Sequence, residues 1–363
     1  MQRSIPCTVM RGGTSKGLYF LAKDLPDDEA IRNEVLLAAM GSPDARQIDG
    51  MGGSHPLTSK VAIISESSRE DADVDYLFLQ VVVDKAQVSD SQNCGNILAG
   101  VGPFAIENKL VGVSDSLTQV RIHMVNTGSI AVANVETPNG LVNYEGNATI
   151  DGVPGTSAPI ILDFLDVAGS SCGALLPTGN VVDIINGVEV TCIDNGMPVV
   201  ILNAKDFDLI GDEQPETIEA NNKIKEKVEA IRLVAGELMG LGDVKGKTVP
   251  KMSLVSKAKA GGIINTRTFI PHRVHDAIGV LGAVSVASAC VLEGSVANKI
   301  INTRFQPGNC QLMVEHPTGF FTVELSFREE NDSVAIERSA LLRTARKLMS
   351  GDVFIPSGIW NKP

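Results

Sequence analysis

The sequence is short of cysteine pairs and of aromatic residues. Its six cysteines, at positions 7, 94, 172, 192, 290 and 310, form no CxxC pair and follow no regular spacing. Neither a disulfide framework nor a cysteine-based zinc site is therefore expected, and free thiols fit a reducing cytosol. Aromatic residues make up 4% of the 363 residues, whereas there are 35 glycines. This balance favours tight turns, packing of small side chains and a large share of β structure.

Positive charge is also scarce. The chain carries 31 Lys and Arg against 43 Asp and Glu, a formal net charge of −12. Binding to nucleic acid or to an anionic membrane surface needs a basic face, so neither partner is expected. An anionic small molecule stays open as a ligand, provided that a few positive groups are concentrated around it.

No long hydrophobic run is present. The longest, residues 277–292, is rich in Gly, Ala and Ser and is short for a bilayer span, so a buried core helix is expected there. The first ten residues contain no apolar core of a signal peptide. These features predict a soluble, cytoplasmic protein. The length of the chain suits two domains.

Several segments occur twice, in the same order. Both copies read as α+β patterns, in which alternating apolar residues predict strands and an apolar small-residue stretch predicts a buried helix. We therefore expect two pseudo-symmetric domains, 1–185 and 186–363, each a β-barrel-like sheet around a central helix, with a C-terminal helix that packs back on the first domain. Two unrelated halves that share common local patterns are the alternative. The pairs are 18–28 with 199–210, 34–41 with 230–240, 59–65 with 250–256, 92–111 with 273–292, and 124–136 with 314–326.

The two predicted central helices begin near Cys94 and His275. A two-domain protein of this kind commonly binds its ligand between the domains, and the beginnings of both helices are expected there. The first backbone N–H groups of a helix attract anions. The ligand site is therefore predicted at these helix ends.

Cys94 is the first candidate for chemistry, in the segment SQNCGNILAG (91–100). Asn93 can cap the helix, Gly95 lets a ligand approach the backbone, and Asn96 can donate or accept a hydrogen bond. A thiol at this position is suited to acid–base work or to donation to a developing anion. The alternative is a small buried side chain with no chemical role.

Lys60 is the second candidate. It follows a glycine-rich loop with Gly53 and Ser59 and precedes an apolar strand. A partly desolvated lysine can lose its proton and act as a base. A surface lysine whose stem covers apolar residues is the alternative, and the sequence leaves both open.

The segment MRGGTSKG (10–17) is a third candidate. It does not match the phosphate-binding P-loop. Gly12, Thr14 and Ser15 can form a backbone nest for a carboxylate, with Arg11 as a charged clamp; a simple turn is the alternative.

Two segments of the second half complete the candidates. The loop GSSCGALLPTGN (169–180) contains Ser170, and HRVH (272–275) contains His272 and Arg273. Two histidines without a third ligand in view do not make a zinc site, so no metal is expected. Both segments are instead predicted to contact the substrate.

These motifs resemble the PrpF-like family of cofactor-independent isomerases, which has the diaminopimelate epimerase-like fold. The resemblance rests on MRGGTSKG, IDGMGGSHPLTSKVAII, NCGNILAGVGPFAIE and LLPTGN, and it extends to RTARKLMSGDVFIP (343–356). Within the family, the segment 40–53 and the segment around Cys94 are most similar to the branch of 4-oxalomesaconate tautomerases. Other branches isomerise 2-methylaconitate, in propionate metabolism, or methylitaconate.

The resemblance implies roles for the candidates. Lys60 and Cys94 would flank the substrate as catalytic residues, and the neighbouring polar residues would hold its carboxylates. The implied reaction is a 1,3-allylic proton shift that converts 4-oxalomesaconate to 4-carboxy-2-hydroxymuconate in gallate- or protocatechuate-type degradation, without a cofactor. Diaminopimelate epimerases use a second cysteine, where this chain has His275, so racemisation by two thiols is not expected.

Three questions stay open at this point. The substrate is one of several unsaturated di- or tricarboxylates, and either Lys60 or Cys94 returns the proton. A homodimer is one possible assembly. A non-catalytic accessory protein that binds tricarboxylates is the alternative outside the enzyme class.

Overall fold

The computed structural model describes residues 1–90, 93–165, 167–270, 272–330 and 333–360, and it divides into two compact units. Unit 1 comprises Met1–Asp163 and Leu342–Pro363, and unit 2 comprises Phe164–Leu341. The division differs from the predicted boundary at residue 185. Residues 164–185 belong to unit 2, and the C-terminal residues from 342 onward belong to unit 1.

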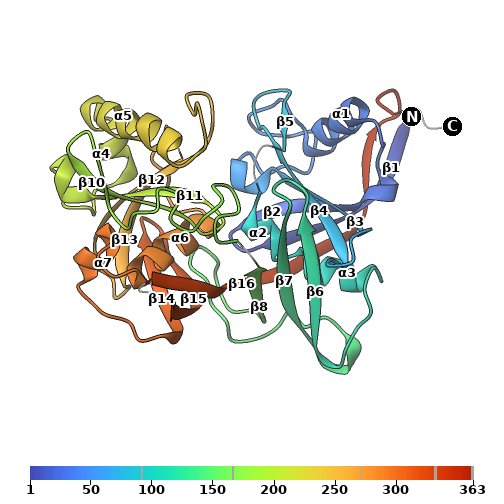
Figure 1. Ribbon diagram of the computed structural model, residues 1–363. Coiled ribbons are helices and arrows are strands. Elements are labelled where there is room, and N and C mark those ends of the chain that lie inside the picture. The colour runs from blue at the N-terminus through green and yellow to red at the C-terminus, as the bar shows by residue number, and fades with distance from the viewer. Residues whose placement is uncertain (91–92, 166, 271, 331–332, 361–363) are drawn as a thin grey trace. The chain divides into compact units, whose positions relative to one another are not determined.

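The strands of unit 1 form a closed ring in the order β16-β1-β2-β3-β4-β6-β7-β8 (Figure 1), because β16 pairs with β1 and with β8. A short strand, β5, pairs with β4 outside this ring. The strands are β1 (Gln2–Gly12), β2 (Ser15–Leu21), β3 (Lys60–Glu66), β4 (Val74–Val81), β5 (Val88–Ser89), β6 (Ser116–Met124), β7 (Ser129–Thr137), β8 (Pro159–Leu165) and β16 (Ser333–Pro356).

Unit 2 repeats this arrangement in the order β9-β10-β11-β12-β13-β14-β15, followed by the first part of β16. The strands are β9 (Asp183–Ile185), β10 (Val188–Asp194), β11 (Pro198–Asn203), β12 (Lys251–Lys257), β13 (Ile264–Phe269), β14 (Gly308–His316) and β15 (Gly319–Glu330). In each unit a parallel pair is followed by an antiparallel one: β2–β3–β4 in unit 1 and β11–β12–β13 in unit 2. This agreement confirms the predicted α+β fold with two pseudo-symmetric halves.

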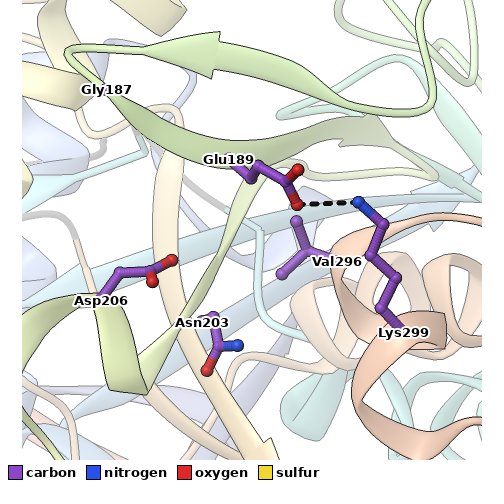
Figure 2. Close-up of a pocket in the computed structure, with 6 residues that line it drawn as sticks. All are labelled: Gly187, Glu189, Asn203, Asp206, Val296 and Lys299. Carbon is purple, nitrogen blue, oxygen red and sulfur yellow. Dashed lines mark hydrogen bonds and ion pairs between the residues drawn. The ribbon is translucent and has the colours of Figure 1, made fainter.

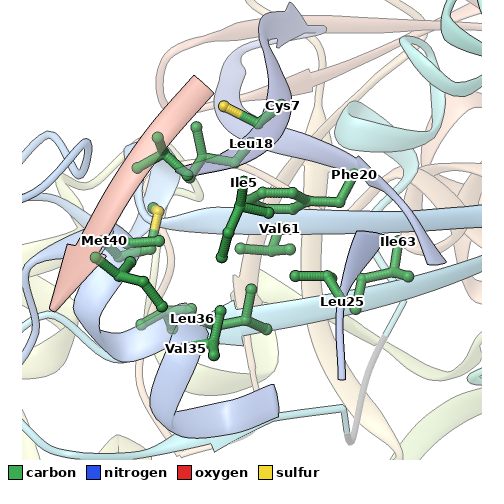
Figure 3. Packing of buried hydrophobic residues seen from close by; sticks show 14 of the residues in the cluster. Ile5, Cys7, Leu18, Phe20, Leu25, Val35, Leu36, Met40, Val61 and Ile63 are labelled. Atoms are coloured by element: carbon green, nitrogen blue, oxygen red, sulfur yellow. The ribbon is translucent and has the colours of Figure 1, made fainter. Parts of the chain in front are cut away.

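An outer helix covers one face of each sheet. In unit 1, α1 (Glu29–Met40) begins at Asp28, whose side chain accepts from Ile31 N, and ends at Gly41 in the left-handed conformation. Its side chains Val35 and Leu36 pack against apolar residues of β1, β2 and β3 (Figure 3). Each such buried side chain contributes about 1.5–3 kcal/mol of hydrophobic stabilisation. In unit 2, α4 (Pro215–Glu219) and α5 (Asn222–Leu238) occupy the corresponding place in the sequence, and α5 packs in the same way.

The central helix of unit 2 is α6 (Val280–Val291), and it is buried along nearly its whole length. Its polar side chains are satisfied internally: Ser285 donates to Met197 O at 2.7 Å, and Ser288 accepts from Asn195 Nδ2 at 2.7 Å. A short helix, α7 (Val296–Ile301), follows. No helix in the described part of the chain is long and apolar enough to cross a membrane.

The predicted start of this helix is wrong by one turn. The residue that caps α6 is Gly279, and His275 lies in the preceding loop, where its N–H donates to Thr268 O at 2.9 Å. The two segments are both rich in small apolar residues, so a shift of one helical turn leaves their similarity almost unchanged. The position equivalent to Cys94 at the beginning of the helix is thus Gly279.

The central helix of unit 1 is divided into α2 (Gly95–Leu98) and α3 (Val101–Glu107), where one long helix was predicted. Pro103 lacks the N–H that would bond back across the join. A Cβ at Gly100 would lie 2.5 Å from the Tyr19 hydroxyl, so the break falls where Tyr19 reaches the helix backbone.

The predicted C-terminal helix is wrong. Residues 333–356 form the long strand β16, whose register with β1 runs from Gly12 opposite Ala345 to Gln2 opposite Pro356. The backbone hydrogen bonds to neighbouring strands override the helix propensity of a segment such as LLRTARKLM. The part of this strand from Leu342 onward nevertheless belongs to unit 1.

Candidate active site in unit 1

Lys60 is a buried side chain held by one glutamine. It is the first residue of β3 and is 6% exposed. Its Nζ donates to Gln80 Oε1 at 2.7 Å and lies 5.0 Å from the centre of the Phe78 ring. Gln80 Nε2 donates to Ser59 O at 2.9 Å, which turns the amide oxygen toward Lys60. The amide and the ring therefore fix the direction of the amine.

The loop before Lys60 is internally bonded. Ser59 is fully buried, donates to Val81 O at 2.8 Å and accepts from Gln47 Nε2 at 2.7 Å. Gly53 is exposed, and a Cβ there would lie 2.4 Å from Thr58 Oγ1. In the structure both residues shape the loop, and their predicted contact with substrate stays a prediction.

Cys94 is the residue that caps α2, and it is partly exposed. Its carbonyl accepts from Leu98 N at 2.9 Å and from the Tyr76 hydroxyl at 3.2 Å. Asn93 Oδ1 accepts from Cys94 N at 2.9 Å, and Asn93 Nδ2 contacts Met124 Sδ at 2.8 Å. Among the described residues no side chain caps α2, so the first N–H groups of the helix, which begin at Gly95, lie beside the thiol.

The structure brings Lys60 and Cys94 to the same face of β4. Along this strand, Tyr76, Phe78 and Gln80 alternate with residues of the outer core, so they share the inner face. Tyr76 contacts Cys94, whereas Phe78 and Gln80 contact Lys60. Burial, and secondly the charge of Cys94, raises the pKa of Tyr76, so its hydroxyl stays a donor.

The turn between β1 and β2 packs directly on α2. A Cβ at Gly12 would lie 2.4 Å from Asn96 O, so this approach requires glycine. Asn96 Nδ2 donates to Thr14 Oγ1 at 3.0 Å. Ser15 Oγ and Asn96 Oδ1 are buried and have no hydrogen-bond partner among the described residues. Since buried polar atoms are normally paired, these two are candidates for contact with a ligand.

Arg11 has a structural role. Its Nη1 donates to Gly13 O and to both oxygens of Thr344, and its Nη2 donates to Ser157 Oγ at 3.2 Å. Burial, and secondly the charge of Arg346, lowers the pKa of Arg11. The guanidinium thus fastens the β1–β2 turn to β16, and its service as a carboxylate clamp stays a prediction.

The remaining predicted residues belong to unit 2 and are exposed. His272 Nδ1 lies 3.5 Å from a Glu229 carboxylate oxygen, and Arg273 Nε lies 4.0 Å from one of Glu219. Ser170 lies in an exposed turn and donates its N–H to Val167 O at 3.1 Å. Within unit 2 these three serve surface contacts, and their role in substrate binding stays a prediction.

A cavity of about 210 Å³ in unit 2 does not suit an anionic substrate (Figure 2). It is lined in part by two carboxylates, Glu189 and Asp206, and its cation, Lys299, already pairs with Glu189 at 2.7 Å. The pocket is therefore not a candidate for the active site.

Sequence reasoning missed Tyr76, Phe78 and Gln80. The available signal was the alternation in VDYLFLQV, which ends an otherwise apolar inner face with an amide. It also missed Lys251, although the repeat aligns PKMSLVS with the segment of Lys60.

The chain is similar to known proteins over nearly its whole length. The family model described as "PrpF protein" matches residues 2–356. The chain is 59% identical over 363 residues to a 4-oxalomesaconate tautomerase of Pseudomonas putida, covering 100% of this chain and 99% of that one. It is also 59% identical to a (4E)-oxalomesaconate Δ-isomerase of a Novosphingobium species, covering 97% and 98%.

A crystal structure of a methylitaconate Δ-isomerase superposes with a TM-score of 0.85 at 35% identity, covering 100% of this chain and 99% of that one. Both the whole-chain family match and the fold therefore agree with the motifs that surround Lys60 and Cys94. The chain belongs to the PrpF protein family.

Proposed function

We propose that this protein is a tautomerase that moves a proton within an unsaturated tricarboxylate, with 4-oxalomesaconate as substrate and 4-carboxy-2-hydroxymuconate as product. The observation that carries the proposal is the pair formed by a buried lysine and a partly exposed thiol on one face of β4. The 59% identity to a 4-oxalomesaconate tautomerase over the whole chain supports the choice of substrate. The cytoplasm is the expected compartment for an enzyme with a free reactive thiol.

Lys60 acts as the base in this mechanism. As a neutral amine it removes a proton from the carbon between the keto group and the double bond. The resulting dienolate spreads its charge over the keto oxygen and the conjugated carboxylates. Return of the proton to the oxygen, from Lys60 or from Cys94, gives the dienol, so no atom is gained or lost overall.

The start of α2 stabilises the intermediate. The N–H groups from Gly95 onward lie beside Cys94, and the unpartnered hydroxyl of Ser15 lies at the adjoining turn. Donors placed where charge develops lower the barrier more than donors that bind substrate and transition state equally.

A second candidate is isomerisation of methylitaconate, in which the proton returns to carbon. The chain is 35% identical to a methylitaconate Δ-isomerase of known structure and 59% identical to a 4-oxalomesaconate tautomerase. Tautomerisation is therefore the favoured function. The same lysine and thiol would serve both reactions.

Proton NMR in deuterated buffer tests the proposal. With 4-oxalomesaconate, we expect faster keto–enol conversion and deuterium at the carbon that loses the proton, and little change in methylitaconate run in parallel. Lys60→Met should lose this activity, whereas Lys23→Met, at an exposed position, should retain it. Turnover of methylitaconate alone would make methylitaconate the substrate in place of 4-oxalomesaconate. Wild-type rates in folded Lys60→Met would refute the mechanism.

A further inference from the structure

Lys251 occupies in unit 2 the place that Lys60 occupies in unit 1. Each lysine is the first residue of its strand, β12 or β3. In the parallel pairing, Lys251 lies opposite Val199, and Lys60 lies opposite Gly17. These two partners are themselves equivalent, because each lies five residues before the Ala-Lys-Asp turn that both repeats share.

The surroundings of Lys251 lack the acceptor that Lys60 has. The pairing of β12 with β13 ends at Met252 and Phe269, so no described residue of β13 pairs with Lys251, whereas in unit 1 Gln80 pairs with Lys60. Lys251 is 8% exposed, and within the described part of the chain its Nζ has no hydrogen-bond or ion-pair partner. Burial, and secondly the charge of Arg232, lowers the pKa of Lys251 to about 8. Most of the side chain is shielded from water, but Nζ is not among the fully enclosed atoms without a partner, so an anionic ligand can reach it from solvent.

The direction of the side chain follows from the strand. Met252 and Leu254 pack in the outer core with α5, so Lys251 and Ser253 point to the opposite, inner face of β12. Ser253 Oγ is already paired with Thr268 Oγ1 at 2.9 Å, so it does not serve Lys251.

The beginning of α6 lies at the same end of unit 2. A Cβ at Gly196 would lie 3.1 Å from a Leu281 methyl group, and Ser285 donates to Met197 O at 2.7 Å. These residues immediately precede β11, whose start pairs with Lys251. In unit 1 the turn before β2 contacts Asn96 of α2 in the corresponding way. A buried lysine and an uncapped helix start thus share one end of each unit.

We propose that Lys251 is the cationic group of a carboxylate-binding site in unit 2, and that its ligand is a carboxylate of the unsaturated di- or tricarboxylate substrate. The oxygens of the ligand take the place that Gln80 Oε1 has beside Lys60. The choice of ligand rests on the proposed function, whereas the presence of an anion site does not.

Calorimetric titration with tricarballylate, a saturated tricarboxylate without the double bond that the reaction needs, tests the site. We expect Lys251→Met to raise the dissociation constant at least about tenfold, because the variant loses a charge-assisted hydrogen bond. Lys257→Met, at the exposed end of the same strand, should bind as the wild type does. Circular dichroism establishes that each variant is folded. Unchanged affinity in folded Lys251→Met would overturn the proposal, as would Lys251-dependent binding of inorganic phosphate without binding of tricarballylate.

A second measurement covers a variant that fails to fold. Acetic anhydride labelling of the wild type, read by mass spectrometry, should acetylate Lys251 more slowly when tricarballylate is present; equal rates would contradict the proposal. Wild-type turnover of 4-oxalomesaconate tests the proposed function separately. Lys251-dependent binding without turnover would leave the anion site standing and remove the tautomerase.

Discussion

The two units share a scaffold but differ in what surrounds their equivalent lysines. Lys60 has an amide acceptor and an aromatic ring, whereas Lys251 has no paired residue among those described on β13 and has the charge of Arg232 nearby. The residues that cap the central helices differ too: Cys94 in unit 1 and Gly279 in unit 2. The repeat thus preserves strand register, whereas the proposed acid–base pair, Lys60 and Cys94, belongs to unit 1. This asymmetry suits movement of one proton within one substrate and does not suit racemisation by two equivalent thiols.

Removal of the Cys94 thiol should give the largest effect. We expect Cys94→Ala to lower kcat by about 100-fold or more, because it loses a group placed to transfer a proton or to stabilise the intermediate. Cys310→Ala, a partly buried thiol of unit 2, is the matched control and should keep kcat within about twofold. Steady-state kinetics at constant pH measures both, and equal losses in the two variants would remove the distinction between the units.

Neutralisation of Lys251 should change how stability depends on pH. The pKa of Lys251 is lowered from 10.5 to about 8, so the unfolded chain binds more protons between these values and folding gains stability as pH rises through this window. Across the full window this one group raises the free energy of unfolding by about 3 kcal/mol. Urea unfolding of ligand-free protein at pH 7.5 and pH 10 should therefore show that the free energy of unfolding of the wild type rises relative to that of Lys251→Met. A constant difference between the two proteins would contradict a buried, unpaired ammonium.

Addition of one methyl group next to each central helix, at Gly12 or at Gly279, should lower the free energy of unfolding more in unit 1 than in unit 2. Gly12→Ala places a Cβ 2.4 Å from Asn96 O and should lower the free energy of unfolding by about 1–3 kcal/mol. Gly279 has a negative φ and open space around it, so Gly279→Ala should change stability by a few tenths of a kcal/mol. Urea unfolding compares the two, and equal losses would show that α2 does not depend on this close approach.

Replacement of Gln80 should make Lys60 resemble Lys251. We expect Gln80→Leu to keep the fold and to lower kcat by about tenfold, because the amine loses the hydrogen bond that directs it. Gln119→Leu, an exposed glutamine on β6, is the control. A change confined to KM would assign Gln80 to substrate binding instead of positioning.

The sequence predicted the repeat, the strands and the placement of Cys94 at a helix start, and it left open whether Lys60 is buried. These follow from local patterns, such as an apolar run after SerLys or Asn residues before a small-residue helix. The helix start at Gly279 could not be predicted, because the small residues of 273–292 fit the repeat almost equally well one turn away. The strand β16 was missed because its pairing with β1 joins the two ends of the chain.

The partners of the site residues were the least predictable part. Arg11 looked like a ligand clamp, yet its hydrogen bonds go to Gly13, Thr344 and Ser157, of which Thr344 and Ser157 are distant in the sequence. The register of β3 and β4 places Gln80 opposite Lys60, and this register depends on packing at both faces of the sheet. Motifs suggested the candidate reactive groups, and tertiary structure determined which partners each of them has.

The most direct test of the division between the units is a side-by-side measurement of kcat and KM for 4-oxalomesaconate in Lys60→Met and Lys251→Met. A base that acts in the transition state and a cation that binds a carboxylate leave different signatures. We expect Lys60→Met to lose kcat by about 1,000-fold, and Lys251→Met to raise KM at least about tenfold while kcat stays within about threefold. Loss of kcat in Lys251→Met with an active Lys60→Met would contradict this assignment.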